Sequence, residues 1–377
     1  MVEEARKKVI DHFNAKDDHC IFTQNASGAL KIVGECYPFC EEGKFLLLAD
    51  NHNSVNGIRE YCKRSHAAFE YVPIRYDDLR IDQDVLEDAL SKSEARKHKL
   101  FAFPAQSNVS GVQHHLSWIK KAQAKGWDVL LDAAAYAPSS KLDLSEVNPN
   151  FVSISFYKIF GYPTGLGCLL MHKDSFELLE KKWFAGGTVT LASVMAPHHY
   201  LAGNHERFEN GTINYLDIPA LSIGIDYINQ IGIERIHERV VSLSTYLFER
   251  LTKLTHANHV KKLKLFGPQD RNHVGGTLIM TFLTENGVVI PFEEVEQKAN
   301  NEMISLRSGC FCNPGIDEVN NCLTMQELSQ YFTSRTTGDY YDMIATLKKM
   351  RGAIRVSVGL ATTQHDLDRF IDFVKQF

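Results

Sequence analysis

The sequence has no apolar run of the roughly 18–20 residues that a membrane-spanning helix needs, although 44% of its 377 residues are hydrophobic. It also has no basic excess, because 41 Lys and Arg residues stand against 46 Asp and Glu residues, for a formal net charge of −5. This balance argues against nucleic acid or an anionic membrane surface as the main partner. The segment MVEEARKKVIDHF predicts an amphipathic helix, not a signal peptide, because it contains no apolar core.

Metal-binding motifs are missing as well. Cys310 and Cys312 form a C-x-C pair, and no second pair of suitable spacing completes the four ligands of a structural zinc. Gly309, Pro314 and Gly315 mark turns, so we expect both thiols on a loop and not in the core. Eight cysteines in a chain of this length without an export signal favour reduced thiols and a cytoplasmic location.

No internal repeat or low-complexity tract is present, which excludes solenoid architectures. Short apolar runs instead alternate with helical patterns in the first half of the chain, which predicts an α/β fold with a mostly parallel, doubly wound sheet. The runs are HCIFT (19–23), KFLLLAD (44–50), KLFAFP (99–104), WDVLLDAA (127–134), FVSISFY (151–157) and GCLLMH (167–172).

The pattern changes after about residue 216. Long amphipathic helical patterns precede the apolar runs GTLIMTFL and AIRVSVGL, with EEVEQKANNEMI between them and a final helical pattern at the end. We therefore predict a large domain over 1–215 and a smaller α+β domain over 216–377 that carries the C-x-C loop. The region 324–350 also reads as helical, and the sequence assigns it no role.

Polar residues follow several of the predicted strands. Ligands of open α/β sheets bind beyond the carboxyl ends of the strands. The turn QNASGA, with Ser27, opens a helix and suits a phosphate, while His52, Asn108, Asp132 and Lys158 follow later strands. Each has an ordinary explanation by itself: a helix cap, a surface histidine, a turn residue or a solvated charge. Together they suit pyridoxal phosphate, which needs a lysine for its aldehyde and an acid for its pyridine nitrogen.

A nicotinamide dinucleotide is the alternative cofactor for such a sheet. It requires G-x-G-x-x-G directly after the first strand. The segment GYPTGLG does not match this pattern, and it follows a late strand.

On these motifs the chain resembles the class V, fold-type I pyridoxal-phosphate enzymes of the cysteine desulfurase group. Within that group it is most similar to the N-terminal desulfurase domain of molybdenum cofactor sulfurases. The resemblance runs through nearly the whole chain and implies the fold of type I PLP-dependent transferases. It rests on FTQNASGALKIV, FPAQSNVSGV, LLDAAAY, SFYKIFGYPTGLG, FAGGT, RFENGTINYLDIPAL, LRSGCFCNPG and AIRVSVG, of which SFYKIFGYPTGLG and GCFCNP are highly specific.

The resemblance implies how the cofactor is held. Lys158 matches the lysine that forms the Schiff base, and Asp132 matches the aspartate paired with the pyridine nitrogen. His52 matches the histidine stacked on the ring, and Asn108 matches the asparagine near the ring hydroxyl. The positions that match phosphate-binding residues are Ala26, Ser27, Ser155 and Tyr157.

The resemblance also implies a reaction and an assembly. Thr212 matches a residue that reaches the phosphate of the partner subunit, which implies a homodimer. Arg355 matches the arginine that clamps the carboxylate of L-cysteine, a task suited to a planar guanidinium. Cys312 falls at the position of the nucleophile, whose thiolate attacks the sulfur of the substrate to leave a persulfide and alanine. His52 and Arg355 are candidates for favouring that thiolate, and Cys310 is a relay or a spare thiol.

The sequence departs from the family pattern at several places. It starts at the helix that follows a YLDHAG-like strand and turn in the family, so the closure of the substrate pocket is left open. Full-length molybdenum cofactor sulfurases carry a further pterin-binding domain after the region matched here, and no sulfur acceptor is assigned. Cys322 stands well beyond Cys312, where relatives often have a closer cysteine. Ala135 replaces the glutamine of many plain cysteine desulfurases, which fits the molybdenum cofactor sulfurase branch better.

Two other functions stay open on the sequence. One is a different class V activity, such as a C–S lyase that acts on a cysteine conjugate, for which Cys312 is dispensable but Lys158 is not. The other is a catalytically idle relative that serves as a scaffold, against which the joint presence of Lys158, Asp132, His52 and Arg355 argues.

Overall fold

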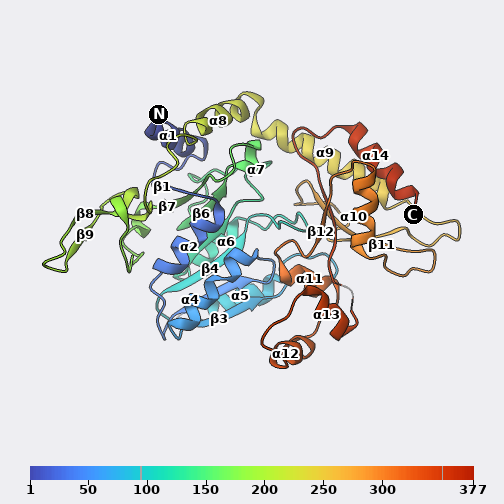
Figure 1. Cartoon of the computed structure of the whole chain (residues 1–377), viewed down its shortest axis with the longest axis horizontal. Helices are drawn as coiled ribbons and strands as arrows, with labels where there is room; N and C mark the ends of the chain where they lie inside the picture. The colour runs from blue at the N-terminus through green and yellow to red at the C-terminus, as the bar shows by residue number, and fades with distance from the viewer. Residues whose placement is uncertain (94–95, 350) are drawn as a thin grey trace.

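The computed structural model describes residues 1–93, 96–349 and 351–377. A seven-stranded sheet and a four-stranded sheet lie side by side, with helices packed around each (Figure 1). The order in the larger sheet is β1-β7-β6-β5-β4-β2-β3. Its strands are β1 (Asp18–Thr23), β2 (Lys44–Leu48), β3 (Ala68–Val72), β4 (Lys99–Pro104), β5 (Asp128–Asp132), β6 (Phe151–Ser155) and β7 (Gly167–His172).

Five adjacent strands of this sheet, from β6 to β3, are parallel, which confirms the predicted mostly parallel sheet. Strand β7 runs antiparallel to both β6 and β1. Successive side chains of β2 enter different cores, since Phe45 and Leu47 pack on one face and Leu46 and Leu48 on the other. Burial on both faces explains why these strands appear in the sequence as continuous apolar runs.

Helices connect and cover the strands of the larger sheet. They are α1 (Val2–His12), α2 (Ala26–Cys36), α3 (Asn53–Asn56), α4 (Ile58–Arg64), α5 (Gln83–Ser91), α6 (Ser117–Gln123), α7 (Tyr157–Phe160) and α8 (Ala220–Ile231), with the short 3₁₀ turns η1 (Lys173–Ser175), η2 (Gly186–Thr188) and η3 (His205–Phe208). The predicted N-terminal helix is present as α1, and it buries Ala5 and Val9 as its apolar period requires.

The smaller sheet is antiparallel and has the order β10-β11-β13-β12. Its strands are β10 (Leu263–Phe266), β11 (Thr277–Phe282), β12 (Arg307–Gly309) and β13 (Ala353–Ser357). The helices of this part are α9 (Ile233–Leu251), α10 (Phe292–Asn301), α11 (Pro314–Asn320), α12 (Met325–Thr333), α13 (Tyr340–Leu347) and α14 (Gln364–Lys375). This confirms the α+β character of the second half, while the boundary at 215/216 stays a prediction.

Several elements differ from the sequence predictions. The run FVSISFY was expected to be extended through Tyr157, but β6 ends at Ser155 and Tyr157 begins the single helical turn α7. This expectation was wrong because Phe156 already has helical dihedral angles (φ −68°, ψ −33°), and Gly161 ends the turn in the left-handed region. The region 324–350 is helical as predicted, in α12 and α13, with residue 350 outside the described residues.

Elements that the sequence did not predict are short or lie at edges. They include β3, β10, β12, α5, α11 and the projecting hairpin of β8 (Val189–Ala192) and β9 (His199–Leu201), which is drawn at the left of Figure 1. Strands of three or four residues carry too few side chains to show a period.

Candidate active site

The carboxyl ends of β2, β4, β5 and β6 and the start of α2 surround one cavity of about 650 Å³, its open mouth included. This is where parallel sheets bind ligands. Eight of the residues predicted from the sequence line it: Ala26, Ser27, His52, Asn108, Asp132, Ser155, Tyr157 and Lys158. The fold therefore brings together side chains that are far apart in the sequence, from Ala26 to Lys158.

A group of polar donors lies at the N-terminus of α2. Asn25 caps this helix, with its Oδ1 accepting from the backbone N–H of Gly28 at 3.0 Å. The N–H of Ala26 donates to Ser155 Oγ at 2.9 Å, and the Ser27 and Ser54 hydroxyl oxygens are 2.6 Å apart. A helix N-terminus with hydroxyl groups around it in this arrangement suits a phosphate group.

Asp132 is a buried carboxylate at the base of the cavity. Its Oδ1 accepts from the Ser153 hydroxyl at 3.0 Å and from the N–H of Ala134 at 3.0 Å. These two bonds fix the plane of the carboxylate and use only one of its oxygens. An oriented acid of this kind fits the protonated pyridine nitrogen of pyridoxal phosphate.

His52 lines the same cavity as a neutral ring. Burial lowers the pKa of its imidazole, Asp132 opposes this by raising the pKa, and Lys158 lowers it further. Its Nδ1 accepts from the N–H of Ser54 at 3.1 Å, so the ring proton lies on Nε2. A neutral, fixed imidazole is suited to packing against an aromatic ring.

Lys158 projects from the one-turn helix α7 into the opening of the cavity. Within the described part of the chain, its amine makes no hydrogen bond or ion pair. An amine that is unpaired beside a buried carboxylate and an anion cradle has the chemistry to hold an aldehyde cofactor. The residues present therefore fit pyridoxal phosphate.

The C-x-C loop meets the site through its backbone. The carbonyl of Phe311 accepts from Asn108 Nδ2 at 2.8 Å, and the carbonyl of Cys312 accepts from the N–H of Asn53 at 2.7 Å. The side chain of Cys312 is exposed, while Cys310 is half-buried. Burial raises the pKa of the Cys310 thiol, and Asp317 adds to this effect. Exposure thus favours Cys312 over Cys310 as a nucleophile.

Arg355 and Thr212 lie outside the lining of this cavity. Arg355 lies at its rim, where Nη1 donates to the carbonyl of Asn108 at 2.7 Å and the guanidinium lies 5.4 Å from the centre of the Phe311 ring. Thr212 lines a separate cavity together with Lys31 and Asn210. Within one subunit, Thr212 thus lies apart from the eight predicted residues that line the first cavity. The expected role of Thr212 in the site of a partner subunit stays a prediction.

Sequence reasoning missed several polar residues of the site. Ser54 and Gln106 line the cavity, and Gln106 Nε2 donates to the carbonyl of Ala135 at 3.0 Å. Asp50 and Asn313 lie behind it and connect to Asn108. Gln106 and Asp50 each stand at the end of a predicted strand, which is the signal that singled out their neighbours Asn108 and His52.

Neither metal chemistry nor a membrane span is indicated by the described residues. In residues 1–93, 96–349 and 351–377 no three His, Cys, Asp or Glu side chains gather as metal ligands. No helix among them has the length and apolar character to cross a bilayer.

The chain matches the aminotransferase class-V family over residues 1–370, and it belongs to that family. Molybdenum cofactor sulfurase 3 of Aedes aegypti is 35% identical, in an alignment covering 100% of this chain and 51% of the relative. The human molybdenum cofactor sulfurase is 34% identical over 99% of this chain and 44% of its own length. The chain thus spans about half the length of the curated relatives it matches.

Solved structures share this fold. A cysteine desulfurase from Thermococcus onnurineus superposes with a TM-score of 0.81 at 23% identity, covering 100% of this chain and 83% of the other. The cystine C–S lyase C-DES, solved with cysteine persulfide, gives a TM-score of 0.76 at 17% identity, covering 100% and 87%. These likenesses confirm the predicted fold of type I PLP-dependent enzymes.

Proposed function

We propose that this chain is a pyridoxal-phosphate-dependent cysteine desulfurase of the molybdenum cofactor sulfurase type. It removes sulfur from L-cysteine, leaves a persulfide on Cys312 and releases alanine. The observation that carries the proposal is the single cavity lined by eight predicted residues, with the Cys312 loop hydrogen-bonded to its rim. The large domain (1–215) holds the cofactor, and the small domain (216–377) supplies the Cys312 loop and Arg355.

Different residues of the cavity bind different parts of the cofactor. The hydroxyls and N–H groups around Ala26, Ser27, Ser155 and Tyr157 hold the phosphate, and His52 and Asn108 contact the ring. The carboxylate of Asp132 keeps the proton on the pyridine nitrogen. When bound, the cofactor supplies an electron sink for the Cα–H bond of the amino acid.

Three side chains act on the substrate. Arg355 binds the carboxylate of L-cysteine through its planar guanidinium. The amine of Lys158 accepts the proton from Cα and returns a proton later in the reaction. The Cys312 thiolate attacks the substrate sulfur, so that the S–S bond forms as the Cβ–S bond breaks, and the carbon skeleton leaves as alanine after protonation.

A C–S lyase is the second candidate, favoured by the shared fold of the cystine C–S lyase C-DES. A lyase releases a sulfur-containing product by elimination and does not need a protein thiol as acceptor. The two functions therefore differ in what happens at Cys312, while both need Lys158.

Intact-protein mass spectrometry after incubation with PLP and L-cysteine tests the proposal. We expect a gain of one sulfur mapped to Cys312, with one alanine per sulfur. Cys312→Ser should abolish both the gain and the turnover, whereas Cys322→Ser, which removes the other exposed thiol, should leave them unchanged. Full sulfur release by Cys312→Ser would instead favour the lyase, and a colourless protein with PLP would favour the scaffold.

We also propose a cytoplasmic homodimer. The exposed side chains of Leu191, Val194, Met195 and Tyr200 on the β8–β9 hairpin, with Leu216 nearby in the sequence, support a second copy as a partner. The position of Thr212 away from the cavity is consistent with a role in the partner's site. The described cysteines are all free, which is consistent with a reducing compartment.

A further inference from the structure

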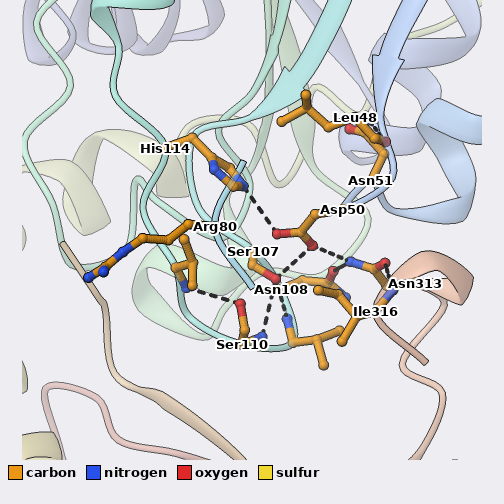
Figure 2. Close-up of polar contacts among 12 residues, drawn as sticks. Leu48, Asp50, Asn51, Arg80, Ser107, Asn108, Ser110, His114, Asn313 and Ile316 are labelled. Carbon is orange, nitrogen blue, oxygen red and sulfur yellow. Dashed lines mark hydrogen bonds and ion pairs between the residues drawn. The ribbon is translucent and has the colours of Figure 1, made fainter. Parts of the chain in front are cut away.

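Asp50 is a fully buried carboxylate that lies behind the candidate active site, 0% exposed, just after β2. Its Oδ1 accepts from Ser107 Oγ at 2.8 Å and from Asn313 Nδ2 at 2.7 Å, and its Oδ2 lies 3.1 Å from His114 Nε2 (Figure 2). A buried carboxylate is costly unless it is satisfied by donors. Here the donors come from two other segments, so the carboxylate ties these segments together.

Asn313 connects this group to the proposed nucleophile, because it follows Cys312 directly in the chain. It is 0% exposed. Its Nδ2 also lies 3.1 Å from Asn108 Oδ1, and its Oδ1 accepts from the N–H of Ile316 at 3.3 Å, which caps α11. One amide thus connects the start of α11, the buried Asp50 and a residue that lines the cavity.

Two further bonds hold the backbone of the loop. Asn108 Nδ2 donates to the carbonyl of Phe311, and the N–H of Asn53, next to His52, donates to the carbonyl of Cys312 at 2.7 Å. The loop is therefore docked on the segments that follow β2 and β4, and these segments also carry His52 and Asn108 of the cavity.

The docked loop has an unfavourable backbone conformation. Phe311 and Cys312 have φ angles of +58° and +55°, a region that non-glycine residues rarely adopt. Such conformations persist when surrounding contacts determine them, and they cluster at functional sites. The hydrogen bonds that hold this backbone come from Asn53 and Asn108, and the next residue, Asn313, is held by Asp50.

We propose that Asp50 and Asn313 are positioning residues that dock the Cys312 loop at the rim of the cavity and hold its strained backbone. This inference rests on the proposed function for the role of Cys312, but the docking itself is a property of the resting protein. Asp50 does not line the cavity, and it acts through Asn313.

Hydrogen exchange measured by mass spectrometry tests the docking in the PLP-loaded protein. Asn313→Asp keeps a side-chain oxygen that can accept from the N–H of Ile316. It replaces the amide group that donates to Asp50 with a second carboxylate oxygen. We expect peptides covering 306–316 and the N–H of Asn53 to exchange at least about tenfold faster in this variant. The double variant D50N/N313D places an amide opposite the new carboxylate again, and it should recover most of the protection.

A matched control is available at the other end of α11. Asn321 Nδ2 donates to the carbonyl of Asp317 at 2.8 Å and to its Oδ1 at 3.0 Å. Asn321→Asp therefore also sets one carboxylate against another, without touching the Cys312 loop, and should leave loop exchange and turnover near wild type. If N313D does not fold, Asn313→Ser, which retains a capping hydroxyl but does not reach Asp50, is measured in its place.

Steady-state kinetics separate positioning from a structural effect. We expect N313D to lower kcat for sulfur transfer about tenfold with little change in KM, because an undocked loop misplaces the thiol but leaves the substrate-binding groups in place. Unchanged loop exchange in a folded N313D, or acceleration spread equally over the strands of the large sheet, overturns the proposal. A wild-type protein without desulfurase activity refutes the proposed function, while the exchange results still decide the docking.

Discussion

At the scale of single residues, Asp18 shows how burial changes a carboxyl group outside the site. It is the first residue of β1 and is 5% exposed, and its Oδ1 is buried with no hydrogen-bond partner among the described residues. Burial raises the pKa of Asp18 to about 7, the nearby Asp17 adds to this, and Lys173 opposes it. The folded protein therefore holds a proton here that the unfolded chain loses near its ordinary pKa of 3.8.

The contribution of Asp18 to the free energy of unfolding should therefore depend on pH. Because the folded pKa is the higher one, the contribution is fully present below about pH 4 and is lost as the pH rises toward about 7. Asp18→Asn should therefore raise the free energy of unfolding by roughly 2–4 kcal/mol at pH 8 and change it little at pH 4. Urea denaturation at the two pH values measures this. Asp17→Asn, at an exposed side chain, is the control, and an equal gain in both variants would contradict the assignment.

At the scale of elements, the junction between the Cys312 loop and the large sheet depends on one glycine. Gly315 lies in the first turn of α11, where a Cβ atom would stand 2.1 Å from the carbonyl oxygen of Ala49. Contact with backbone at this distance is impossible, so a larger residue must push α11 and the loop before it away from the end of β2.

We therefore predict that Gly315→Ala lowers turnover of L-cysteine by at least about tenfold, because it displaces Cys312 by part of an ångström or more. Binding of PLP, followed by its visible absorption, should change little, since the residues proposed to hold the cofactor lie at the strand ends of the large sheet. Gly359→Ala is the matched control, because no atom lies within 4 Å of a Cβ placed there. Normal turnover in the Gly315 variant would show that α11 does not set the position of the loop.

At the scale of the whole molecule, the β8–β9 hairpin projects from the body and carries apolar side chains into solvent (Figure 1). Val194 and Met195 at its tip are each 99% exposed. Exposed apolar side chains that cluster on one element are typical of an interface, which is why a second copy of the chain is proposed as the partner.

Light scattering on a sizing column tests the assembly. We expect the wild-type protein to have twice the mass of one chain, and the double variant V194D/M195D to shift to the mass of a single chain at micromolar concentration, because two charges then lie in an apolar contact. Met303→Asp, at another exposed methionine, should not change the mass. A wild-type monomer would refute both the dimer and the proposed role of Thr212 in a partner's site.

The strands that carry the site could be predicted from the sequence with bounds close to those observed. Strands β4 and β7 coincide with the runs KLFAFP and GCLLMH, because burial on both faces makes such strands continuously apolar. The direction of β7, which runs antiparallel to both β1 and β6, could not be predicted in this way, because an apolar run has no direction. Nor could β12, whose three residues, from Arg307 to Gly309, pair with β13.

The sequence by itself determined the inventory of the site: an amine, a carboxylate, an imidazole ring, an amide and a helix N-terminus, each at the end of an apolar run or opening the helix after it. Local order fixes such positions, because a strand end and a cap depend on near neighbours in the chain. Only the tertiary structure decided that Asp50 is buried and bonded to Asn313, and that Thr212 lies apart from the cavity. Those facts depend on contacts between distant segments, and no local pattern of residues encodes which distant donor meets a buried carboxylate.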